Sequence, residues 1–217
     1  DGIYFIPPSG TDTPERQESL VSELSAALPP GIDVEMDGRY QAMFSYKSKN
    51  YALLGYDGVI SVKGSALKSR GMEKYLREFT SEVIRLLLHG EGGEVEALYL
   101  EYHQRLRKHE FDISWIAKTE SLNESTDSYR KKVSQGKRNP SAAYEIAFRS
   151  SHEYRAGDQI SYYVTGRGKG VSAWENCRPA ASYDPARPDE NTEYYVEKLR
   201  QVKKRFEPYL DREGTLF

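Results

Sequence analysis

The chain has 217 residues, and its 31 Lys and Arg nearly balance its 33 Asp and Glu, so the formal net charge is −2. Bulk charge therefore gives no support for nucleic-acid binding, which would have to depend on local basic clusters. The single cysteine, Cys177, excludes an internal disulfide and a multi-cysteine zinc site and fits a cytoplasmic location, while no apolar run approaches the ~20 residues that span a bilayer.

The N-terminal residues combine an apolar run with a helix signal. Asp1 stands without a preceding Met directly before the apolar run, so we expect a buried strand over residues 2–7 in a piece of a longer protein. A helix is predicted from Pro14, with Thr13 as its N-cap. Its apolar residues recur at helical spacing until a Pro-Pro-Gly sequence ends it at residues 29–31.

The next segments predict an antiparallel sheet. Strands are expected at residues 32–36 and 39–46, around an Asp-Gly turn. Residues 47–64 have the clearest hairpin pattern, because two apolar runs flank Gly55-Tyr-Asp-Gly58. Antiparallel pairing brings the two ends of this hairpin together. Its basic residues are therefore expected to converge at one edge of the sheet: Lys47, Lys49, Lys63, Lys68 and Arg70.

The pattern becomes helical from about residue 72. Apolar positions follow a 3.6-residue period to residue 87, and the opposite side carries a stripe that includes Lys74, Arg77 and Arg85. A second helix, acidic at its start and basic at its end, follows a short glycine-rich joint and ends near residue 107. Two such consecutive helices predict an antiparallel pair.

The remaining sequence mixes helices, strands and loops. Its expected elements are a short strand at 113–119, a polar basic loop at 123–139, a proline-led helix to about 150, a strand at 159–164, a loop at 165–190 and a last helix through residue 206. The predicted fold class is α+β, with an antiparallel-sheet unit at residues 1–70 and a mostly helical unit at residues 71–217.

Segments in four parts of the chain, in the family's order, resemble family B DNA polymerases. Lys49-Asn-Tyr51 and the segment Lys63-Gly-Ser-Ala-Leu-Lys-Ser-Arg70 are similar to the Lys-Lys-x-Tyr and Lys-Gly-x5-Arg segments at that family's palm-to-thumb junction. Asp1-Gly-Ile-Tyr-Phe resembles the end of its Asp-Thr-Asp motif. Residues 139–147 and 157–164 resemble its late thumb pattern, a proline-led helix followed by a strand that begins after Gly-Asp.

The resemblance implies a fragment made of the end of the palm, residues 1–70, and the thumb, residues 71–217. It implies a parent enzyme that performs DNA-directed nucleotidyl transfer with two Mg²⁺ ions, with Asp1 as one catalytic, metal-binding carboxylate. The implied partner is a primer–template DNA duplex, with deoxynucleotides bound only together with the fingers. We expect the 217 residues alone to bind no metal and to be inactive.

The expected DNA contacts lie mainly on the hairpin. Lys49 and Tyr51, two residues apart on one predicted strand, are expected to share a face and to reach the minor groove at the primer end. Gly64 is expected to let the backbone pass close to a partner. Phosphate contacts are expected from basic residues of the hairpin and of the helical stripe: Lys63, Lys68, Arg70, Lys74 and Arg77.

Two departures from the family pattern predict weaker DNA binding than the family pattern implies, and other interpretations remain open. Ser48 and Ser69 stand where the family has the first lysine of one pair and a neighbouring arginine of the other. Surface lysines also deter edge-strand aggregation, and a basic helix stripe is also an ordinary solvated face. The alternative function is a non-catalytic interaction module, which the near-neutral charge favours. A small-molecule enzyme has no nucleophile, cofactor loop or histidine cluster to support it.

Overall fold

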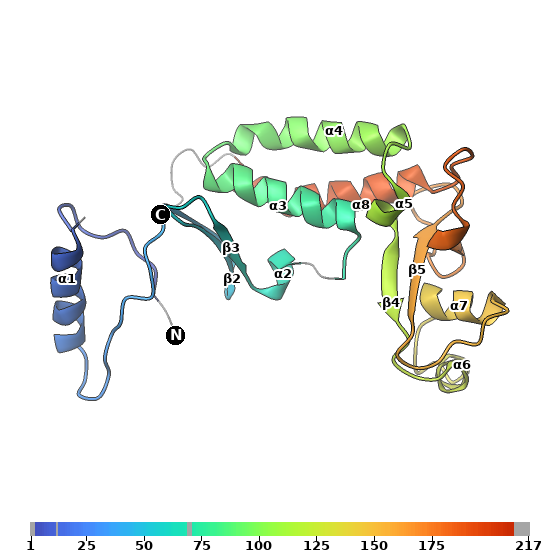
Figure 1. Cartoon of the computed structure of the whole chain (residues 1–217), viewed down its shortest axis with the longest axis horizontal. Coiled ribbons are helices and arrows are strands. Elements are labelled where there is room, and N and C mark those ends of the chain that lie inside the picture. Colours follow the sequence, from blue (N-terminus) through green and yellow to red (C-terminus); the bar gives the residue numbers. More distant parts are fainter. Residues whose placement is uncertain (1–2, 12, 69–70, 211–217) are drawn as a thin grey trace.

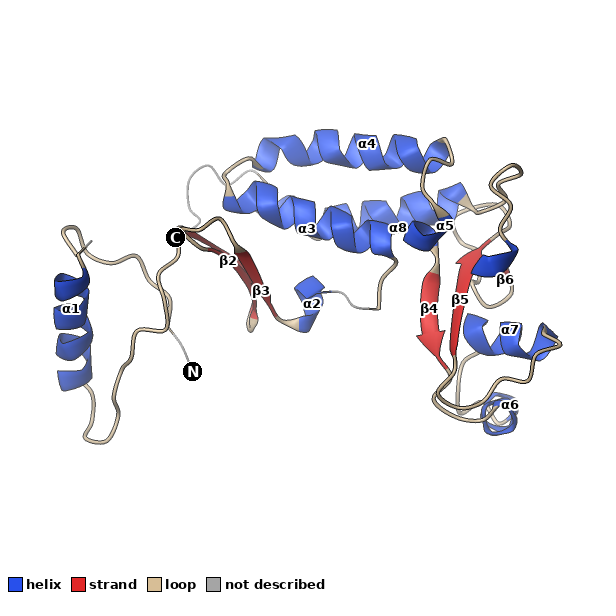
Figure 2. Cartoon of the chain, viewed as in Figure 1, coloured by secondary structure: helices blue, strands red, loops and turns tan. Residues whose placement is uncertain are grey.

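The computed structural model describes residues 3–11, 13–68 and 71–210. The long helices α3, α4 and α8 extend from one small antiparallel sheet to the other, and a further helix, α1, stands apart at one end (Figure 1). Figure 2 separates the two sheets, in red, from the helices, in blue. The fold class is α+β, as the sequence predicted. Among the described residues, no helix is both long and apolar enough to cross a membrane.

The described residues up to residue 40 contain one helix and bury little surface. Helix α1 spans Pro14–Ala26, and the Thr13 side chain caps it as predicted. The predicted strands at 2–7 and 32–36 are wrong, because the described residues there pair with no neighbouring strand. Ile3 is 88% exposed and Ile6 66% exposed, so the expected burial is also absent. Apolar sequence alone does not make a strand when no partner strand lies beside it.

The first sheet is formed by β1 (Ala42–Lys47), β2 (Asn50–Leu54) and β3 (Ile60–Lys63), in that order. The predicted hairpin between β2 and β3 is confirmed, with Tyr51 opposite Lys63 and Leu54 opposite Ile60. A second, tighter hairpin joins β1 to β2. The one-turn helix α2, Ser65–Lys68, follows β3 directly.

The helical layer forms the main core. Helix α3 (Lys74–Leu88) continues through the short turn η1 (Gly92–Glu94) into α4 (Val95–Arg107), and the two helices run antiparallel as predicted (Figure 1). The last helix, α8 (Thr192–Lys204), packs against both. The same core includes residues of the first sheet, so sheet and helices are joined by one continuous apolar cluster.

Helix α8 is attached to both sheets. Beyond its C-terminal end, which continues into η3 (Glu207–Tyr209), Phe206 packs on Tyr46 of β1 with ring centroids 5.8 Å apart. Arg205 donates to the Ala66 carbonyl at 2.9 Å, and the Tyr209 hydroxyl donates to the Tyr46 carbonyl at 2.7 Å. Near its N-terminal end, the Val164 amide donates to the Tyr195 hydroxyl at 2.8 Å. These contacts place the two sheets at opposite ends of one helix.

The second sheet carries a small lobe with its own core. Its strands are β4 (Lys118–Ser121), β5 (Gln159–Val164) and β6 (Cys177–Pro179), and helices α6 (Thr126–Ser134) and α7 (Ala142–Arg149) pack beside it. The predictions of α7, β5 and α8 are confirmed. The predicted strand at 113–119 begins instead with the short helix α5 (Ile113–Ile116), whose N-terminus is capped by Asp112. The loop predicted at 165–190 contains β6 and the short turn η2 (Ala180–Ser182).

A buried ion pair lies where α8 meets the start of α3. Glu73 is only 3% exposed, and the Lys198 ammonium group donates to its Oε1 atom. The second carboxylate oxygen, Oε2, is buried without a hydrogen-bond partner among the described residues. Removing one member of a buried pair costs more than the pair itself contributes, because the other charge stays buried and uncompensated.

We expect Lys198→Met to lower the free energy of unfolding by about 3 kcal/mol, because Glu73 would lose its counter-ion. Urea unfolding monitored by circular dichroism measures this. The double variant Glu73→Gln with Lys198→Met should recover part of the loss, since no buried charge remains. Arg200→Ala, which breaks the exposed Arg200–Glu197 pair on the same helix, should change stability little. A loss in Lys198→Met no larger than in this control would contradict the assignment.

Candidate nucleic-acid interface

The turn between β1 and β2 determines how the predicted contact residues are presented. Ser48 and Lys49 form a two-residue turn, and Lys49 has a φ of 59°. Lys49 and Tyr51 therefore do not share a strand face, and this part of the prediction is wrong. Residues directly opposite each other on paired strands share a face, so it is Lys63 that lies beside Tyr51.

Asn50 and Gly64 hold the two ends of the β2–β3 hairpin against each other. The Asn50 side chain donates to the Ser48 carbonyl at 2.9 Å and accepts from the Ala66 amide at 2.9 Å. A Cβ at Gly64 would lie 2.3 Å from both the Lys49 carbonyl oxygen and Asn50 Oδ1, and Gly64 has a φ of +90°. The close approach expected at Gly64 is thus made within the chain.

The basic ends of the hairpin converge as predicted where the structure describes them. Lys49 and Lys63 are both exposed and are brought together by the Gly64 contact and the strand register. Lys68, also exposed, ends the short helix α2, which starts next to Gly64. We call Lys49, Lys63 and Lys68 the hairpin cations. Asp1 and Arg70 lie outside the described residues.

The basic residues of the helical stripe on α3 are less available for phosphate contacts than the sequence suggested. Lys74 lies over the ring of Trp115 in α5, with its ammonium nitrogen 4.4 Å from the ring centroid. Arg85 pairs with Glu82 at 3.0 Å and with Glu91 at 3.7 Å. Arg77 is exposed. The stripe therefore consists of cations with different surroundings and does not form a uniform basic track.

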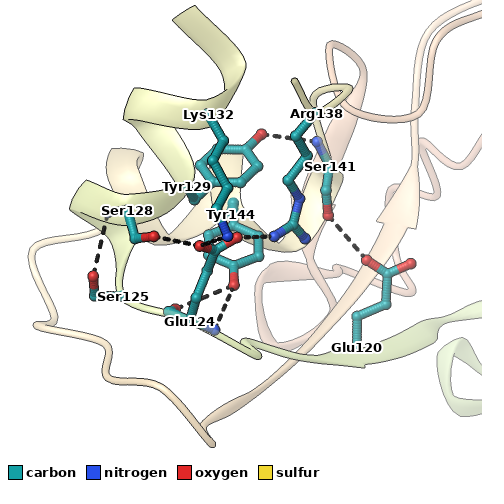
Figure 3. A network of polar contacts seen from close by, with 9 residues as sticks. All are labelled: Glu120, Glu124, Ser125, Ser128, Tyr129, Lys132, Arg138, Ser141 and Tyr144. Atoms are coloured by element: carbon teal, nitrogen blue, oxygen red, sulfur yellow. Dashed lines mark hydrogen bonds and ion pairs between the residues drawn. The ribbon is translucent and has the colours of Figure 1, made fainter. Parts of the chain in front are cut away.

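A polar network in the small lobe engages further basic residues (Figure 3). The segment predicted as a loop contains α6, whose N-terminus is capped by Ser125 and whose Tyr129 is buried. Glu124 accepts from the Lys132 ammonium at 2.7 Å and also from the Arg138 guanidinium. The sequence showed the cations but not the carboxylate that binds them, because the three residues belong to one site only after α6 has formed.

Two stacked tyrosines complete this network (Figure 3). The rings of Tyr129 and Tyr144 lie 4.0 Å apart and nearly parallel, at 7°, and the Arg138 guanidinium lies over both. Hydrogen bonds from Lys132, Ser128 and Arg138 lower the pKa of the Glu124 carboxyl to about 2. Its negative charge is therefore present at all ordinary pH values and offsets the two cations.

The described residues contain no group of three or more His, Cys, Asp or Glu that could hold a metal ion. A two-metal site needs several carboxylates within a few ångströms of one another. The part of the chain that the structure describes therefore does not provide such a site by itself.

Comparisons with known proteins connect this arrangement to one family. A family model described as DNA polymerase family B matches residues 14–208. The DNA polymerase of Desulfurococcus sp. (strain Tok) is 25% identical over 203 residues, which is 91% of this chain and 25% of that protein. The DNA polymerase of Pyrococcus glycovorans is 25% identical over 224 residues, which is 100% of this chain and 28% of that protein. The chain thus spans about a quarter of the length of these curated relatives.

A solved structure has a similar fold. The family B DNA polymerase of the hyperthermophilic archaeon Pyrobaculum calidifontis matches with a TM-score of 0.69 and 23% identity. The match covers 91% of this chain and 24% of that one. The likeness supports the α+β arrangement described above.

We expect Gly64→Ala to lower the free energy of unfolding by about 2 kcal/mol, because the new Cβ would collide with Lys49 and Asn50 and the positive φ disfavours alanine. Chemical denaturation measures this. Gly170→Ala is the matched control, since a Cβ there meets nothing within 4 Å, and it should be nearly neutral. Equal effects of the two substitutions would show that the contact at Gly64 is not tight.

We expect Glu124→Gln to flatten the pH dependence of stability in acid. The folded-state pKa of about 2 lies below the ordinary value of 4.5, so the stabilisation is complete above pH 4.5 and is lost as the pH falls toward 2. Thermal unfolding across this range compares the variant with the unaltered chain. Glu153→Gln, at an exposed position outside the network, should leave the profile unchanged. An unchanged profile in Glu124→Gln would exclude the network as its source.

Proposed function

The chain belongs to DNA polymerase family B, and from this we propose that it binds a primer–template DNA duplex and supplies the part of a polymerase that holds the duplex product. The observation that carries this proposal is the convergence of the hairpin cations at one exposed edge. Asn50 and Gly64 hold this edge in place, and within the described residues Lys49, Lys63 and Lys68 form no ion pair with a carboxylate. Such an edge suits a polyanionic backbone.

Residues 1–70 would form the end of a palm and residues 71–217 a thumb. Several large apolar side chains of the first 36 residues are exposed, although the family match already includes α1. These side chains have no core of their own in the described chain. We expect further polymerase segments, of the kind that the longer relatives contain, to cover them.

The contacts with DNA would be independent of sequence. Lys63 and Lys68 would neutralise phosphates, and Tyr51, on the same sheet face as Lys63, would reach the minor-groove edge of the primer end. The minor groove has acceptors at similar positions in every base pair, so a contact there suits an enzyme that copies any template. Lys49 would add a cation at the adjacent turn.

The polymerase reaction itself would belong to a larger assembly. Two Mg²⁺ ions held by carboxylates would stabilise the charge that develops during nucleotidyl transfer, and Asp1 is the proposed ligand from this chain. The 217 residues alone would hold DNA without polymerising it. An intracellular location is part of this proposal, because the proposed substrate is DNA.

We expect Lys63→Ala with Lys68→Ala to weaken duplex binding and to reduce the slope of log affinity against log salt by about 2, since each lost phosphate contact removes ~0.9. Fluorescence anisotropy with a labelled primer–template, titrated at several salt concentrations, measures both effects. Lys108→Ala removes one exposed cation at the far end of α4 and should leave the slope unchanged.

Absence of binding by the unaltered chain at low salt would contradict the proposal. It would instead favour a non-catalytic module that makes protein contacts. Equal slopes for the double variant and the unaltered chain would keep DNA binding but move it away from the hairpin cations.

A further inference from the structure

Tyr51 has a partner that the DNA-binding proposal does not use. The Tyr4 hydroxyl donates to the Tyr51 hydroxyl at 3.2 Å, across 47 residues of sequence. The two rings are 5.3 Å apart and tilted by 57°, and the ring of Tyr40 lies 6.4 Å from that of Tyr4. The N-terminal segment is thus linked to the sheet next to the proposed primer contact.

The contact between Tyr4 and Tyr51 lies on the face of the first sheet that is accessible to a partner. Ala52 and Leu54 of β2 belong to the core shared with the helices. Tyr51 alternates with them and therefore points to the opposite face, together with Lys63. Tyr51 is half-buried there, while Lys63 is exposed. A phenol and a cation stand side by side on the face away from the helical layer.

The direction of the hydrogen bond determines what Tyr51 can do next. A phenolic hydroxyl has one proton to donate and lone pairs that accept. When Tyr4 donates, the Tyr51 oxygen is engaged as an acceptor and its own proton remains free. Purine N3 and pyrimidine O2 in the minor groove are acceptors, so they require a donor. The hydrogen bond also raises the pKa of Tyr4 to about 12, which keeps its proton in place.

We propose that Tyr4 is a positioning residue, which holds the Tyr51 hydroxyl so that Tyr51 donates its proton to a minor-groove acceptor at the primer end. This inference rests on the proposed function. Chained hydrogen bonds polarise one another, so the contact to Tyr4 also makes Tyr51 a better donor. Tyr4 itself need not touch DNA.

The test uses the unaltered chain and Tyr4→Phe with two primer–templates. The DNAs differ only at the primer-terminal base, which is adenine in one and 3-deazaadenine, lacking the N3 acceptor, in the other. Tyr4→Phe keeps both ring contacts and removes only the hydroxyl. We expect the unaltered chain to bind the adenine primer about threefold to tenfold more tightly than the 3-deaza primer, the size of one hydrogen bond.

In Tyr4→Phe this preference should disappear, whereas affinity for the 3-deaza primer should stay the same. Tyr40→Phe is the matched control, because its ring also touches Tyr4, and it should keep the preference. Thermal unfolding of each variant checks that the fold is intact. A merely structural role of Tyr4 would weaken binding to both DNAs equally.

The outcomes separate the two proposals. No binding of either DNA by the unaltered chain would overturn the proposed function. Binding without any preference for N3 would remove the Tyr51 contact and with it the role of Tyr4. A preference that survives in Tyr4→Phe would overturn the positioning role alone.

Discussion

The attachment of α8 to both sheets is the constraint on which the rest of the structure depends. Aromatic packing and hydrogen bonds around Tyr46 join its C-terminal end to the first sheet, and Tyr195 joins its other end to β5. A helix of 13 residues is about 20 Å long. Helix α8 therefore fixes the separation between the hairpin cations and the polar network of the small lobe. A DNA that contacted both regions would have to span that distance.

The two basic regions at the ends of this helix differ in their electrostatics. At the hairpin, Asn50 and Gly64 use neutral groups to bring the backbone together, so the cations remain available to a partner. In the small lobe, Glu124 and a pair of stacked rings engage Lys132 and Arg138. A count of basic residues would have treated the two regions alike. What separates them is the presence of a carboxylate within hydrogen-bond distance.

A sustained hydrophobic period predicted α3, α4, α8 and β5 correctly. Turn and cap signals predicted the β2–β3 hairpin, α1 and α7. Helix α6 was missed because its sequence is polar and only Tyr129 is buried. The turn at Ser48 and Lys49 was missed because Ser-Lys is not a usual turn pair. Lys49 was therefore expected on the strand, whereas it lies in the turn. The role of Asn50 needs a contact with Ala66, 16 residues away, and spacing in the sequence does not indicate such a contact.

The bonds between the first sheet and the C-terminal end also bear on how the chain folds. Arg205 and Tyr209 reach Tyr46 across 159 and 163 residues of sequence. Closing so long a loop costs entropy before the contact is made, so we expect these contacts to form late in folding. During synthesis, β1 and β2 leave the ribosome long before the residues that cover them. Until then the sides of Phe44 and Tyr46 that Phe206 and Tyr209 cover remain open to water, and the core of the first sheet is incomplete.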